Sequence, residues 1–119
     1  MTQSDLPHLR QLAKNGQVNY SGHAFKQMLS RRISTFLVEA ILMSSTNQLI
    51  ETQSPSSTPG KEHTDERVLI YDPHSSSNVI VICAISLFPL PQITVITAEY
   101  VQDDKWERVS GNPALIRKP

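Results

Sequence analysis

Apolar residues recur at helical spacing over the first 45 residues of the chain and at strand spacing over most of the remainder. The spacing predicts helices over about residues 5–14, 22–32 and 35–45 and a short strand over 17–20. Gly16 is placed to end the first helix, and Ser21 is a good N-cap for the second. The N-terminal part is therefore expected to be mainly helical.

The two helices expected after Ser21 differ in how their apolar residues are distributed. In 22–32 the apolar stripe consists of Ala24, Phe25, Met28 and Leu29. In 35–45 we expect an inner face of Phe36, Leu37, Ala40, Ile41 and Met43. Val38 and Leu42 fall on the opposite side, so this helix is apolar nearly all round and should be heavily covered.

From residue 47 the apolar pattern has a period of two. Strands are predicted over about 48–52, 67–71, 78–86 and 92–100, with a polar Ser- and Pro-rich loop over 54–65 and a turn over 87–91. Helices followed by a meander indicate an α+β fold, with the N-terminal helices on one face of an antiparallel four-stranded sheet. We expect one domain over 1–109 and a C-terminal tail over 110–119.

The amino-acid composition excludes several classes of protein. The 119 residues include 11 Lys+Arg and 11 Asp+Glu, so a uniformly basic nucleic-acid clamp is excluded. Residues 1–50 hold five bases and two acids, a charge of +3, and the remainder balances this with −3. A single cysteine, Cys83, excludes a disulfide within the chain. Without a membrane-length apolar run or a signal-peptide pattern at the start, we expect a cytoplasmic protein that has no membrane contact.

Carboxylates and imidazoles flank the strand predicted at 67–71: Glu62, His63, Asp65, Glu66, Asp72 and His74. A metal site needs three or four such ligands to converge, and nothing in this spacing requires that they do. We therefore expect a polar loop with no metal and no cofactor.

The most distinctive polar pattern lies in the second predicted helix. His23, Gln27 and Arg31 recur at i, i+4 and i+8 and share one stripe. A neutral imidazole there could accept a proton, and Arg31 with Lys26 and Arg32 could hold a phosphate. Equally, His23 could cap its own helix while the arginines complement the helix C-terminus. The residues alone leave both interpretations open.

Two segments resemble a known family. One is Tyr20-Ser21-Gly22-His23-Ala24, followed by Met28, Arg31 and Ile33, and the other is Val95–Tyr100 followed by Asp103-Asp104-Lys105-Trp106. Over about residues 18–107 this pattern is similar to a family of small bacterial proteins catalogued as domain of unknown function 4258. That family is in turn similar to the RelE/ParE-type toxins.

The resemblance implies a metal-independent endoribonuclease that an antitoxin-like protein neutralises. His23 would then be the acid/base, Arg31 the phosphate clamp and Tyr100 an orienting hydroxyl, while Lys26, Arg32 and Arg67 would bind RNA. The family often has Arg where this chain has Gln27, and its central strand commonly carries basic groups that residues 78–82 lack.

These observations give two hypotheses of different classes. The first is a RelE/ParE-like ribonuclease acting on RNA through His23 and Arg31. The alternative is a non-catalytic protein-interaction or regulatory domain of the same fold, using the sheet or the apolar second helix of the pair. A homodimer through Val38 and Leu42 of that helix is a further possibility.

Overall fold

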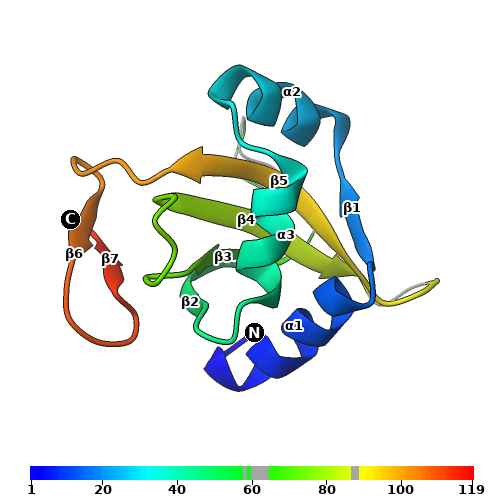
Figure 1. Ribbon diagram of the computed structural model, residues 1–119, viewed down its shortest axis with the longest axis horizontal. Helices are drawn as coiled ribbons and strands as arrows, with labels where there is room; N and C mark the ends of the chain where they lie inside the picture. Colours follow the sequence, from blue (N-terminus) through cyan, green and yellow to red (C-terminus); the bar gives the residue numbers. More distant parts are fainter. Residues whose placement is uncertain (58, 60–64, 87–88) are drawn as a thin grey trace.

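The helical and alternating segments form helices and strands in the order predicted (Figure 1). The computed structural model describes residues 1–57, 59, 65–86 and 89–119, so parts of the expected 54–65 loop and 87–91 turn lie outside the described residues. The helices are η1 (Gln3–Asp5), α1 (Leu6–Lys14), α2 (Gly22–Arg31) and α3 (Thr35–Met43). The strands are β1 (Val18–Tyr20), β2 (Gln48–Gln53), β3 (Arg67–Tyr71), β4 (Val79–Ser86), β5 (Gln92–Tyr100), β6 (Trp106–Arg108) and β7 (Leu115–Arg117). The α+β class is confirmed.

The main sheet has five strands in the order β1-β5-β4-β3-β2, where four antiparallel strands were predicted. β1 is the additional strand, and it pairs parallel to β5 with Val18 opposite Ile93. Parallel neighbours need a long crossover, and the helices and strands between residues 21 and 91 supply it. The sheet is therefore mixed, with short β1 at one edge and β2 at the other.

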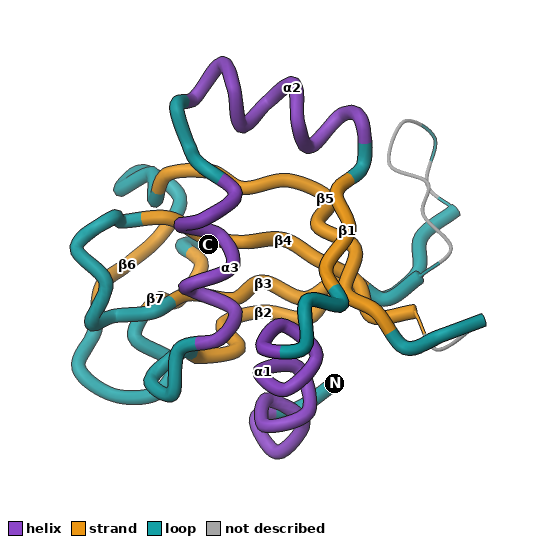
Figure 2. The backbone as a smooth tube through the Cα atoms, turned by 45° about the vertical axis from the view of Figure 1, so that its right-hand side comes forward, coloured by secondary structure: helices purple, strands orange, loops and turns teal. Residues whose placement is uncertain are grey.

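All three α-helices pack on one face of the sheet. Their buried side chains, among them Leu9, Met28 and Ile41, share one apolar core with alternate residues of β3, β4 and β5. In Figure 2, α2 lies along β5 while α3 runs crosswise to it, over the middle of the sheet. The predicted placement of the helices on one face is confirmed.

In α2 and α3 the buried side chains differ in part from those predicted. In α2 the buried residues are Ala24 and Met28, and the other half of the expected stripe is exposed. In α3 the buried residues are Val38, Ile41 and Leu42. The prediction for Ile41 is confirmed, whereas Val38 and Leu42 face the core and not the opposite side. Because α3 is apolar nearly all round, its periodicity does not select one face. Val38 and Leu42 are fully buried in the monomer core, so they cannot form the homodimer seam considered above.

The C-terminal residues differ from the expected tail. β6 and β7 pair as an antiparallel hairpin that covers the opposite face of the sheet from the helices. Trp106 and Leu115 are buried there in a second apolar cluster with Tyr71 and Ile80. The Arg117 guanidinium lies 4.5 Å from the centre of the Trp106 ring, so the hairpin is also held by a cation–π contact.

Side chains from other elements lie against both edges of the main sheet. At the β2 edge the Gln3 amide donates to the Leu49 carbonyl at 2.6 Å and accepts from the Leu49 N–H at 3.3 Å. At the other edge β1 reaches only Val95 of β5, and α2 covers what lies beyond. The contact between α2 and β5 contains residues of the predicted site.

Candidate functional site

The polar stripe of α2 faces β5. Ser21 starts the helix where predicted, because its Oγ accepts a hydrogen bond from the Ala24 N–H at 3.0 Å. One flank of the helix then lies against the part of β5 that β1 does not reach. Gln27 and Arg31 are therefore half-buried rather than exposed.

Arg31 binds the edge of β5. One guanidinium nitrogen, Nη1, donates to the Ala98 carbonyl at 2.9 Å and to Thr97 Oγ1 at 3.1 Å. The Thr97 hydroxyl in turn donates to Gln27 Oε1. This nitrogen thus takes the place of a neighbouring strand's N–H group, and the contacts join α2 to the sheet.

Tyr100 lies at the same place. Its hydroxyl donates to the Arg31 carbonyl at 2.9 Å, and the side chain is 44% exposed. Two of the three predicted catalytic residues, Arg31 and Tyr100, are therefore brought together. The contact uses the Arg31 backbone, at the C-terminal end of α2, where carbonyl groups lack helical partners.

His23 lies apart from this pair. Its side chain is exposed and has no hydrogen-bond partner among the described residues. It precedes Arg31 by eight residues, which corresponds to about 12 Å along the helix axis. Gln27, which lies between them, is already bonded to Thr97. The stripe is therefore an extended row along α2 and does not converge on one phosphate-sized point.

The three predicted RNA-binding cations do not gather in one place. Lys26 and Arg32 are exposed on or just after α2, and neither forms an ion pair within the described part of the chain. Arg67 begins β3, which β4 separates from β5. In the sheet register Val68 lies opposite Cys83 whereas Tyr100 lies opposite Val79, so Arg67 and Tyr100 are at opposite ends.

The carboxylate and imidazole group does not form a metal site in the described residues. Glu62 and His63 lie outside them, and no group of three potential ligands occurs among the others. Asp72 accepts hydrogen bonds from Thr46 Oγ1 at 2.7 Å and from the His74 N–H at 3.0 Å. Burial acts to raise the pKa of Asp72, but these bonds and one from Ser44 keep it below its ordinary value. Its observed role is to fix a turn.

Phe25, Leu29 and Phe36 form a surface that the sequence did not predict. Their exposed fractions are 46%, 78% and 84%, although all three were assigned to inner faces. The Tyr20 ring packs on Phe25 with the ring centres 5.1 Å apart. The Tyr20 hydroxyl donates to the Thr35 carbonyl at 3.3 Å, directly before Phe36. We call Phe25, Leu29 and Phe36 the α2–α3 surface.

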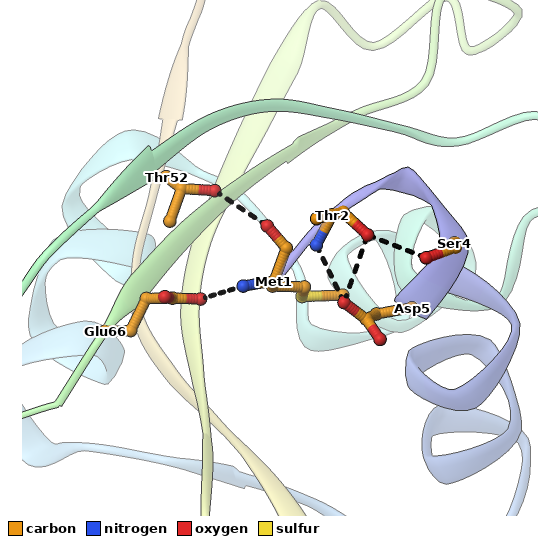
Figure 3. Close-up of polar contacts among 6 residues, drawn as sticks. All are labelled: Met1, Thr2, Ser4, Asp5, Thr52 and Glu66. Carbon is orange, nitrogen blue, oxygen red and sulfur yellow. Dashed lines mark hydrogen bonds and ion pairs between the residues drawn. The ribbon is translucent and has the colours of Figure 1, made fainter.

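A cavity of about 260 Å³ lies elsewhere, between the start of the chain and β3. Three of its polar lining residues form contacts nearby (Figure 3): the Met1 ammonium pairs with Glu66 at 2.6 Å, and Asp5 accepts from the Thr2 N–H at 2.7 Å. Thr52 additionally bonds the Met1 carbonyl at 3.4 Å. These contacts anchor the N-terminal segment to the sheet.

The chain matches no protein-family model, no curated protein and no solved structure. The resemblance described above therefore stays a prediction. None of the helices in the described residues has the length and apolar character needed to cross a membrane.

Proposed function

We propose that this chain is a non-catalytic protein-interaction domain that binds its partner through the α2–α3 surface. The observation that carries the proposal is the exposure of three large apolar side chains on consecutive helices: Phe25 and Leu29 one turn apart on α2, and Phe36 in the first turn of α3. Large aromatic and aliphatic side chains that remain uncovered in a group mark sites of protein contact.

The arrangement of the polar residues supports the same proposal. A metal-independent ribonuclease needs an acid/base and a phosphate clamp at one phosphate. Here the Arg31 guanidinium binds β5, and His23 lies two helical turns away. The residues that suggested catalysis thus have a structural role or stand alone.

The test uses the surface and a matched site on the opposite face. A photo-crosslinking residue replaces Phe36 or, as the control, Ile116 of β7, which is 48% exposed. In the organism that makes the protein, we expect one recurring protein to be trapped from position 36 and not from 116. After purification it should bind the wild type and lose affinity about tenfold or more with Leu29→Ser and Phe36→Ser combined. Unchanged affinity, or no trapped protein, contradicts the proposal.

A RelE/ParE-like fold with ribonuclease activity is the second candidate, and the contact between Tyr100 and the Arg31 carbonyl favours it. The order of helices before the sheet also agrees with that fold. In this case the chain acts on RNA in the cytoplasm and an antitoxin-like protein controls it.

The second candidate has its own test. Induced expression should arrest growth, His23→Ala should relieve the arrest, and the purified protein should cleave RNA in the presence of EDTA. Cleavage that is insensitive to the Leu29→Ser and Phe36→Ser pair but lost in His23→Ala would select this candidate over the interaction domain.

A further inference from the structure

We infer that the α2–α3 surface binds an acidic segment of another protein that inserts large apolar side chains between the exposed ones. The inference rests on the proposed function and specifies the chemistry of the partner. It is carried by the exposed charges close to Leu29 in α2 and by the packing of Phe25 on Tyr20.

One aromatic side chain of the surface, Phe25, is held in place before any partner arrives. Tyr20 packs on Phe25, and its hydroxyl donates to Glu39 at 2.8 Å as well as to the Thr35 carbonyl. Phe25 thus rests on a ring that is tied to the first turns of α3. A side chain that is already held loses little conformational freedom when it is covered, which favours binding.

The free charges within the two helices of this surface are positive. Residues 20–43 contain three cations, Lys26, Arg31 and Arg32, and one carboxylate, Glu39, so three minus one gives +2. Arg31 is engaged with β5, and Glu39 accepts the Tyr20 hydroxyl. Lys26 and Arg32 are exposed and each is three residues from Leu29, so a partner that covers Leu29 meets two cations beside it. Complementary charge at such a rim selects an acidic partner and speeds its association.

The same charges disfavour two other occupants. A second copy of the chain, related by a two-fold axis, would bring the same patch against itself and place Lys26 and Arg32 near their own equivalents. Nucleic-acid affinity depends on how many phosphates are neutralised, and two exposed cations neutralise few.

The probe is a fluorescent designed peptide of about 15 residues with Leu and Phe at helical i, i+4 positions and Glu at its other outward positions. Its twin carries Lys in place of every Glu. We expect saturable binding of the acidic peptide, at least about tenfold weaker binding of the twin, and weakening by salt. Fluorescence anisotropy measures affinity, and amide chemical shifts locate the site on α2 and the start of α3.

Variants assign the effect to this surface. Leu29→Ser with Phe36→Ser should abolish binding, and Ile116→Ser on the far face should leave it unchanged. Lys26→Glu with Arg32→Glu should reverse the preference toward the lysine twin. Circular dichroism checks that each variant is folded. Equal affinity for both peptides, no saturable binding, or shifts confined to other elements overturns the inference.

The two proposals can fail separately. If the protein trapped from position 36 binds through a neutral or basic segment, the acidic partner is wrong and the interaction domain stands. If the chain self-associates through the surface, or RNA displaces the acidic peptide from it, the inference is likewise overturned. If position 36 traps nothing and peptides do not bind, both proposals fail.

Discussion

On the flank of α2 that faces β5, Gln27 and Arg31 are half-buried and hydrogen-bonded, whereas on the other flank Phe25 and Leu29 are exposed. The usual distribution of polar and apolar side chains is thus reversed on either side of the buried Ala24 and Met28. The polar flank joins α2 to an open strand, and the apolar flank is left for a partner. Stability should therefore depend on the first flank and binding on the second.

Of the two flanks, the polar one should show the larger loss of stability. Arg31→Met keeps the length of the side chain but removes its donors to Ala98 and Thr97. The substitution removes a hydrogen bond from a charged donor and leaves the Ala98 carbonyl without a partner. We therefore expect a loss of about 1.5–3 kcal/mol in the free energy of unfolding. Urea denaturation measures it, with exposed Lys26→Met as the control. A variant as stable as the wild type would show that the guanidinium contributes nothing to holding α2.

A smaller effect is expected under the apolar flank. Tyr20→Phe keeps the ring on Phe25 but removes the hydroxyl that bonds Glu39 and Thr35, which should cost roughly 1 kcal/mol. Burial, followed by the Glu39 carboxylate, raises the pKa of Tyr20 above its ordinary value. The folded state therefore favours the protonated hydroxyl, and this contribution is lost as pH rises above about 10.

Urea denaturation at pH 8 and at about pH 11 separates the loss of the hydroxyl's hydrogen bonds from the pH-dependent contribution of Tyr20, since 10 is the ordinary tyrosine pKa. The wild type should lose more stability on this change than Tyr20→Phe does. Tyr100→Phe, the control, should retain the Tyr20 contribution. Identical alkaline losses in wild type and Tyr20→Phe would contradict the role assigned to the Glu39 contact.

At the end of α2, one substitution can remove a positive charge without lowering the stability of the fold. Arg32 has a left-handed backbone with φ of 58°, a region that glycine adopts at less cost. Arg32→Gly should therefore raise the free energy of unfolding by roughly 0.5–1 kcal/mol while weakening acidic-peptide binding. Ser30→Gly, inside the same helix, should be destabilising instead. A destabilised Arg32→Gly would mean that the arginine side chain holds the helix end.

The smallest stability effect belongs to the exposed apolar side chains. Phe36→Ser should change the free energy of unfolding by less than about 0.5 kcal/mol, since the ring is 84% exposed. Met28→Ala, on the buried side of α2, should cost about 2–5 kcal/mol. Denaturation of both variants measures the difference. A large loss in Phe36→Ser would show that the surface is part of the core.

Periodicity was enough to predict the main helices and strands, because each has a clear local apolar pattern. The pairing of β1 with β5 could not be predicted, since it joins residues far apart in the sequence. A tail was expected over 110–119, but Gly111 and Pro113 lie in the connection between β6 and β7. The burial of Trp106 and Leu115 depends on the exposed face of a sheet that the sequence does not reveal.

The candidate site was predictable to a similar extent. The shared stripe of His23, Gln27 and Arg31 follows from helical spacing, and in the structure Gln27 and Arg31 both contact β5. The spacing does not tell which element these residues contact. That element is β5, and its carbonyl is available to Arg31 only because β1 is too short to pair with it. The exposure of Leu29 and Phe36 was missed because an apolar side chain was assumed to point inward.

The two edges of the sheet also bear on self-association. Unpaired strand edges recruit further strands and start aggregation. Here the short β1 leaves part of β5 to the side chains of α2, and Gln3 occupies backbone groups of β2. Protection against edge-to-edge assembly therefore depends on a few long side chains. Loss of Gln3 or Arg31 would leave a folded core with a strand edge that another copy could extend.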